Sequence, residues 1–127
     1  MIKTVTDNRV IEFVAKRLDK VFIPPYTQMG MEKDGEIIAG VIFNHFEGAD
    51  IHISVVGKGW TRGFYADIGD YIFRQLKCSR FTCITETPEV VRLAEKLGGK
   101  VEGLMRDHFG PDRDGFVVGI LKKDYRF

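Results

Sequence analysis

The sequence contains one stretch that combines glycine with basic side chains, Gly57-Lys58-Gly59-Trp60-Thr61-Arg62-Gly63. Residues 50–56 before it alternate between apolar and polar, which is typical of a half-buried strand, and residues 64–76 after it carry apolar side chains at helical spacing. A glycine loop that enters a helix offers free backbone N–H groups and, here, two cations to an anion. The stretch therefore predicts a phosphate cradle. The alternative is an ordinary loop that Lys58 and Arg62 keep soluble, because short glycine motifs are common.

The first half of the chain predicts the elements that lead up to this loop. Residues 2–6 have the pattern of a strand, and Asp7 is placed to cap a helix that Pro24 and Pro25 must end. Three antiparallel strands are expected over residues 27–33, 36–46 and 50–56, with Asp34-Gly35 as a hairpin turn. The middle strand is apolar on both faces, so it should lie centrally in the sheet. The stripe of the first helix is Val10, Phe13 or Val14, Leu18 and Val21.

The second half predicts a parallel strand pair. Residues 81–85 form a strand, and Thr87-Pro88-Glu89 starts a helix that Gly98-Gly99 closes. Two last strands, residues 100–109 and 116–122, flank a turn-rich loop. The strands at 50–56 and 81–85 should lie side by side and parallel, joined by a right-handed crossover. The chain is therefore expected to fold as one α/β domain over residues 1–127, with helices on both faces of a mixed sheet.

Composition limits the classes of function. A net charge of +1 gives no global argument for nucleic-acid binding, so a basic site must be local. The longest apolar run, residues 37–43, is too short to span a bilayer, and no leader-like apolar segment opens the chain, which predicts a cytoplasmic protein with no membrane partner. Cys78 and Cys83 are expected to be free, buried thiols, and no cluster of metal ligands is apparent.

The order of elements, together with the segment from Leu97 to Asp107 (Leu-Gly-Gly-Lys-Val-Glu-Gly-Leu-Met-Arg-Asp), resembles the GCN5-related N-acetyltransferases (GNAT superfamily). In that superfamily a helix ending in Leu-Gly-Phe precedes a strand of the type Glu-Gly-x-x-Arg-Asp. The resemblance covers nearly the whole chain and is strongest to short members, many of them phage or prophage encoded. Those members share a Trp-x-x-Arg segment and a Tyr-x-Phe, which correspond in part to Trp60, Arg62, Tyr71 and Phe73.

The resemblance implies a mixed, mostly antiparallel sheet of six to seven strands with three main helices, and acetyl-CoA as the acetyl donor. The donor would lie in a wedge between the strand ending at Val56 and the strand 81–85. Backbone groups of Ile53, Ser54 and Val55 would hold the pantetheine arm. The diphosphate would sit at the start of the helix that opens at Phe64. Thr87, at the opening of the last helix, would be a further cofactor-binding residue. The diphosphate contacts would be amides near Arg62, Gly63 and Phe64 and the cations Lys58 and Arg62.

Departures from the superfamily pattern fall at the loop and at the usual proton donor. Aligned on Gly63, the loop has Trp60 at its first position and Tyr65 at its last, where the pattern has a small residue. The tyrosine that often protonates the departing thiolate corresponds to Ala94. These departures motivate an alternative, a catalytically degenerate member that keeps the fold as a binding or assembly module.

For an acetyltransferase, two side chains on the strand at 50–56 are catalytic candidates. His52 lies on the face opposite Ile51, Ile53 and Val55, and its near-neutral unperturbed pKa suits a general base. Ser54 on the same face could orient a water or the thiol. A surface or packed histidine is the structural alternative for His52. The acceptor would be a small-molecule or peptide amine of unknown identity, chosen by loops at residues 22–28 and 110–115, and a homodimer is the expected assembly. The implied location is the cytoplasm of a bacterial or phage-infected cell.

Overall fold

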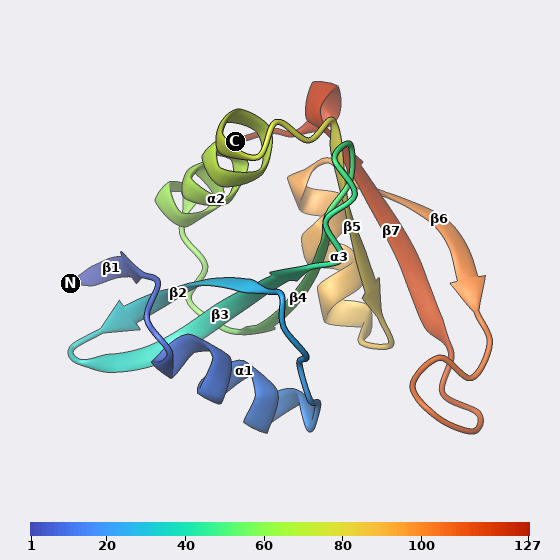
Figure 1. The fold of residues 1–127 in the computed structure, drawn as a ribbon, viewed down its shortest axis with the longest axis horizontal. Helices are drawn as coiled ribbons and strands as arrows, with labels where there is room; N and C mark the ends of the chain where they lie inside the picture. The colour runs from blue at the N-terminus through green and yellow to red at the C-terminus, as the bar shows by residue number, and fades with distance from the viewer.

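The computed structural model describes residues 1–127, which form one seven-stranded sheet with helices on both faces (Figure 1). The strand order is β1-β2-β3-β4-β5-β7-β6, in which only β4 and β5 are parallel. This agrees with the mixed, mostly antiparallel sheet expected from the sequence. The strands are β1 (Ile2–Val5), β2 (Thr27–Lys33), β3 (Glu36–Asn44), β4 (His52–Gly57), β5 (Arg80–Thr85), β6 (Lys100–Met105) and β7 (Gly115–Leu121). The helices are α1 (Arg9–Leu18), α2 (Arg62–Gly69) with its continuation η1 (Asp70–Gln75), α3 (Pro88–Leu97) and the short η2 (Lys122–Asp124).

The meander β2–β4 forms as the sequence predicts, and β1 adds to it beside β2. Asp34 and Gly35 both have positive φ, 52° and 85°, which is the geometry of a tight hairpin turn that keeps the right-handed twist of its strands. In β3, Ala39, Val41 and Phe43 face the main core on the α2 and α3 side, and Ile42 packs against α1 on the other side. The central position predicted for this strand is therefore confirmed, since helices cover both of its faces.

Two helices differ from the periodicity prediction. α1 ends at Leu18 because Asp19 adopts a left-handed conformation (φ 49°) and its N–H turns back to bond the last turn. Val21 therefore lies beyond the helix, 84% exposed, instead of on its apolar stripe. The second helix is α-helical only to Gly69 and continues as a π-helix, in which the Leu76 N–H donates to the Tyr71 carbonyl.

The second half of the chain completes the sheet with β7 inserted between β5 and β6. β6 is shorter than predicted and ends at Met105, because residues 106–114 turn back on themselves through bonds such as that from the Asp112 N–H to the Asp107 carboxylate. α3 starts after Thr87 and ends at Gly98, whose φ of 116° is left-handed. None of the helices is both long enough and apolar enough to cross a bilayer.

Candidate functional site

The parallel strands β4 and β5 separate shortly after they meet. They pair only at His52 with Thr82 and at Ile53 with Cys83, and beyond that point the two halves of the sheet fan apart (Figure 1). A cavity of about 1050 Å³ opens between the separated ends. β4 contributes Ser54, Val55, Val56 and Gly57 to its wall, and the opposite wall is built from the end of β5 and from α3. Backbone groups of β4 that face β5 beyond Ile53 have no strand partner, so they are available to a ligand.

The loop that closes the cavity is shaped by glycine and by a capping threonine. Gly57 has φ 127°, and a Cβ there would overlap the backbone of Ala39, so only glycine fits. Thr61 caps α2, because its hydroxyl accepts a hydrogen bond from the Phe64 N–H at 3.0 Å. The amides of Arg62 and Gly63 precede the first bonded amide of the helix, and both residues are exposed. The loop can therefore offer two backbone donors at the positive end of a helix dipole.

The two cations predicted for this loop lie at its surface. Lys58 and Arg62 are exposed, and neither side chain lines the cavity. The Arg62 guanidinium instead lies 5.2 Å from the centre of the Phe127 ring. Lys96 on α3 does line the cavity, with its Nζ 5.7 Å from the centre of the Tyr65 ring. Sequence reasoning missed Lys96, and the only signal for it was its position in the last turn of a helix.

The bulky residues Trp60 and Tyr65 form one wall of the cavity. Tyr65 is only 3% exposed, and its ring packs against Phe127 at a centroid distance of 4.9 Å. Trp60 is half-buried and stacks on Tyr65, with an interplanar angle of 21°. The aromatic rings are thus packed on one another and on the core, and Arg62 and Gly63 at the helix start remain exposed.

The predicted cofactor residues fall into two groups. Val55, Val56 and Thr87 line the cavity, whereas Ile53 and Phe64 are buried in the main core, where only their backbone groups could contact a ligand. Thr87 precedes α3, but its hydroxyl makes no capping bond. Its own N–H donates to the Thr85 hydroxyl at 3.1 Å. Thr87 is therefore the N-cap residue by position, as the helix start at Thr87-Pro88-Glu89 predicts, but its hydroxyl does not stabilise the helix end.

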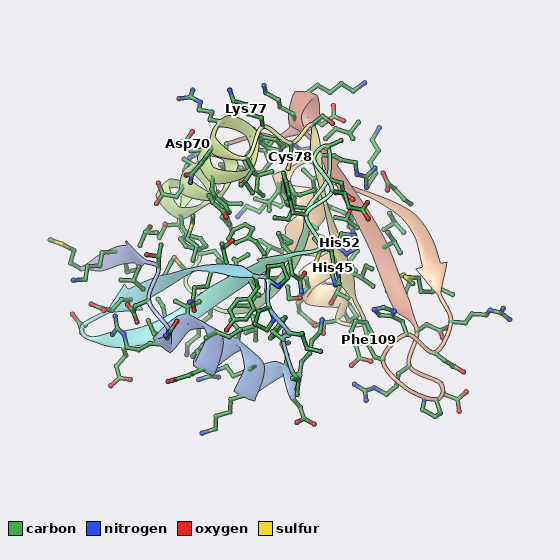
Figure 2. The ribbon with its side chains drawn as sticks, viewed as in Figure 1. His45, His52, Asp70, Lys77, Cys78 and Phe109 are labelled. Atoms are coloured by element: carbon green, nitrogen blue, oxygen red, sulfur yellow. The ribbon has the colours of Figure 1, made fainter.

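The far rim of the cavity carries charged residues that sequence reasoning either missed or assigned to solvent. Arg113 and Glu86 form an ion pair at 2.6 Å, and this guanidinium lowers the pKa of the Glu86 carboxyl. His108 and Phe109, from the same loop as Arg113, complete this side, with Phe109 in the lower right of Figure 2. Of the two loops expected to choose the acceptor, only Arg113 reaches the cavity. The functional residues of loops carry no periodic signal that a sequence could reveal.

Lys20 and Ser54 meet on the α1 side of the cavity. The left-handed turn at Asp19 that ends α1 directs Lys20 toward β4, where its Nζ lies 3.5 Å from the Ser54 Oγ. The ammonium group also lies 5.1 Å from the centre of the Phe22 ring. Lys20 is exposed overall, but desolvation of its ammonium group beside this wall lowers its pKa. An amine is therefore held beside the strand segment that the sequence predicts to bind a thioester.

His52 lies at the closed end of the wedge and does not line the cavity. Its Nε2 is 3.8 Å from the Asp50 carboxylate, and its ring contacts that of His45 at a centroid distance of 5.2 Å (Figure 2). Burial lowers the pKa of His52, while the Asp50 charge acts in the opposite direction. His52 and Ser54 share one face of β4, as predicted, but only Ser54 reaches the cavity wall.

The two cysteines are free and buried, as expected. Burial raises the pKa of the Cys83 thiol to about 12 although Lys20 opposes the shift. A thiol of that kind is a poor nucleophile at neutral pH, so Cys83 is a wall residue of the cavity. Nowhere do three His, Cys, Asp or Glu side chains converge as metal ligands would.

Neither a family model nor a curated protein matches the amino-acid sequence. Solved structures match its fold. A spermidine/spermine N-acetyltransferase of Vibrio cholerae, in complex with manganese ions, is 16% identical with a TM-score of 0.75, over 96% of this chain and 93% of that chain. Mutant forms of the same enzyme are 17% identical with a TM-score of 0.77, over 98% and 97% of the two chains. A chimera of the Vibrio cholerae spermidine N-acetyltransferase and hSSAT is 17% identical with a TM-score of 0.76, over 98% of each chain.

These likenesses confirm the fold predicted from the sequence. The chain has the α/β fold of the GCN5-related N-acetyltransferases.

Proposed function

We propose that this protein is an acetyl-CoA-dependent N-acetyltransferase that transfers an acetyl group directly to a primary amine. The observation that carries the proposal is the separation of β4 and β5 after two paired residues, with a cavity that runs along β4 from Ser54 to Gly59 and Trp60 in the loop before α2. A long, charged thioester needs such a cleft, because it must be held along its arm and at its diphosphate. When bound, acetyl-CoA supplies the activated acyl group.

The chain's own residues fit a ligand of this kind at both ends. At the diphosphate end, the amides of Arg62 and Gly63 and the cations Lys58 and Arg62 offer donors and positive charge, and Lys96 adds a cation from α3. At the acyl end, unpaired backbone groups of β4 can hold the arm and one N–H can face the thioester oxygen. Val55 and Val56 keep the wall between these ends apolar.

Acid–base roles are proposed for the same strand. His52 is the proposed general base, because burial keeps its imidazole neutral near pH 7. Ser54 is proposed to orient a water or the departing thiol. Glu86 is the weaker base, since Arg113 stabilises its charged form. Ala94 is buried in the core, so the thiolate takes its proton from another donor or from solvent.

The second candidate function is a non-catalytic binding module. It is favoured by the alanine at residue 94, because the Ala94 side chain cannot donate a proton to a departing thiolate. The two candidates agree on acetyl-CoA binding and differ on turnover.

We also propose that the protein acts in the cytoplasm on a small-molecule or peptide amine and without nucleic acid, as a homodimer. The neighbouring spermidine N-acetyltransferase is described as dodecameric in an intermediate state, so assembly needs its own measurement.

The test has two steps. Thermal unfolding is first followed with rising acetyl-CoA, and at one hundred times the dissociation constant we expect about 2.7 kcal/mol of stabilisation by mass action. Release of CoA thiol is then screened over amines, amino acids, polyamines and peptide N-termini. Binding with release supports the enzyme, and binding without release with any amine supports the module. No thermal shift at millimolar acetyl-CoA would overturn both.

A further inference from the structure

Lys20 lines the cavity close to the point where β4 and β5 separate. It is the residue that follows the left-handed turn at the end of α1, and its Nζ is 3.5 Å from the Ser54 Oγ on the wall of β4. Ser54 is the first residue of β4 beyond the last pair with β5, so it marks the point where the wedge opens. Lys20 also shares the cavity with Cys83, the β5 residue that pairs with Ile53, one position before Ser54.

The surroundings of Lys20 bring no carboxylate within ion-pair distance of its ammonium group. The ion pairs at the rim of the cavity join Arg113 to Glu86 and Arg92 to Glu89, and Lys20 takes part in neither. Its neighbours are a hydroxyl and the face of the Phe22 ring. Desolvation lowers the pKa of this amine, which raises the fraction of the nucleophilic, neutral form at a given pH.

We propose that Lys20 is acetylated by the protein itself, as an internal acceptor for the acetyl-CoA held between β4 and β5. The inference rests on the proposed function and names a modification site within the same cleft. The ammonium group first loses a proton to solvent. The Nζ lone pair then attacks the thioester carbonyl carbon, a C–N bond forms, and the C–S bond breaks. The nitrogen gives up its second proton as the tetrahedral intermediate collapses, the electron pair of the C–S bond leaves with the CoA sulfur, and the sulfur takes up one proton, so the products are Nε-acetyl-Lys20 and CoA.

Acetylation of Lys20 would have two consequences for the cleft. It removes the positive charge beside Ser54 and replaces the ammonium group with a neutral amide. It also ends the competition between Lys20 and a free amine for the same acyl group. An efficient external acceptor should therefore slow the modification of Lys20, because both amines need the same position at the wedge.

The experiment incubates the full chain with acetyl-CoA and follows each lysine by peptide mass spectrometry. Lys16 is the internal standard, because it is an exposed lysine in the last turn of α1 that does not line the cavity. We expect Lys20 to be acetylated at least about tenfold faster than Lys16, since a held amine reacts as an intramolecular group. The rate at Lys20 should not depend on protein concentration, and excess CoA should slow it without affecting Lys16.

The other outcomes overturn the inference in distinguishable ways. Equal rates at Lys20 and Lys16, while acetyl-CoA still stabilises the protein against heat, overturn self-acetylation and leave the proposed function standing. Fast labelling of Lys20 that CoA does not slow shows simple chemical reactivity of the amine, and it also overturns the inference. Absence of any acetyl-CoA binding overturns both proposals. The variant Lys20→Arg keeps the charge and should lose one acetyl group in the intact mass, with the other lysines unchanged.

Discussion

The guanidinium group of Arg80 on β5 and the carboxylate of Glu102 on β6 meet across the intervening strand, at 2.7 Å between Nη2 and Oε1. The backbone of Gly119 on β7 lies beneath this contact. A Cβ at Gly119 would overlap both the Glu102 carboxylate and the Arg80 guanidinium. The ion pair that joins the three strands therefore depends on the absence of a side chain at residue 119.

Gly119→Ala should displace this ion pair and destabilise the protein. We expect a loss of at most about 1 kcal/mol in the free energy of unfolding, because the displaced atoms are the ends of two flexible side chains in a partly exposed ion pair. Urea denaturation at neutral pH measures the loss. Gly103→Ala on β6 is the matched control, since no atom lies within 4 Å of a Cβ built there. Equal stability of the two variants would contradict the steric explanation.

Much of the architecture could be predicted because it follows from periodicity. The two-sided apolar pattern of residues 37–43 requires a covered central strand, and the Asp34-Gly35 turn requires a hairpin. The parallel pairing of the strands that contain Ile53 and Cys83 follows from the helical crossover between them. Each of these features depends on local spacing, so one sequence suffices to predict it.

Other features could not be predicted, because they depend on tertiary contacts. The end of α1 at Leu18 is decided by the left-handed turn at Asp19, although the apolar spacing continues to Val21. The placement of Lys20 against Ser54 follows from that turn, so the sequence alone showed only a basic stretch of helix. The charged rim of the cavity joins a loop and a strand end that are far apart in the chain.

The threonines before α2 and α3 should differ in their value to stability. Thr61→Ala removes the hydroxyl that accepts from the Phe64 N–H, and we expect a loss of about 1 kcal/mol in the free energy of unfolding. Thr87→Ala should cost less, because the Thr87 hydroxyl makes no capping bond. Chemical denaturation of both variants measures the difference between their free energies of unfolding. Thr61→Ser should retain most of the wild-type stability.

Charge at the start of α2 should control the affinity for acetyl-CoA. Removal of both cations, in Lys58→Ala combined with Arg62→Ala, should weaken binding at least about tenfold, because hydrogen bonds to charged groups contribute roughly 1.5–3 kcal/mol each. Isothermal titration with acetyl-CoA measures the change. Arg74→Ala is the control, because Arg74 is an exposed cation on η1 that does not line the cavity. Unchanged affinity in the double variant would place the diphosphate elsewhere.

The two cysteine thiols should be unreactive toward alkylating reagents in the folded protein. Cys78 and Cys83 are each 2% exposed, and burial raises both pKa values, that of Cys83 to about 12. We expect alkylation by iodoacetamide at pH 8 to be at least about a hundredfold slower in the native protein than in urea, because the thiolate is the reactive form. Rapid native labelling of Cys83 would contradict this prediction, and an acetyl group found on Cys83 would indicate transfer through a covalent acyl-enzyme.

His52 on β4 and His108 at the cavity rim should differ in their effect on the pH profile. Burial holds the pKa of His52 below its ordinary value of 6.5, so the neutral base predominates at pH 7 and the acid limb of kcat/KM should lie below that value. His52→Asn should lower kcat/KM about 10²- to 10⁴-fold and remove this limb.

Because the unfolded state takes up the proton more readily, the free energy of unfolding should also fall as the pH drops below 6.5, and less so in His52→Asn. His108→Asn, at the cavity rim, serves as the comparison. If that variant loses the acid limb while His52→Asn retains it, the base lies on the β6–β7 loop and His52 is a packed residue of the sheet.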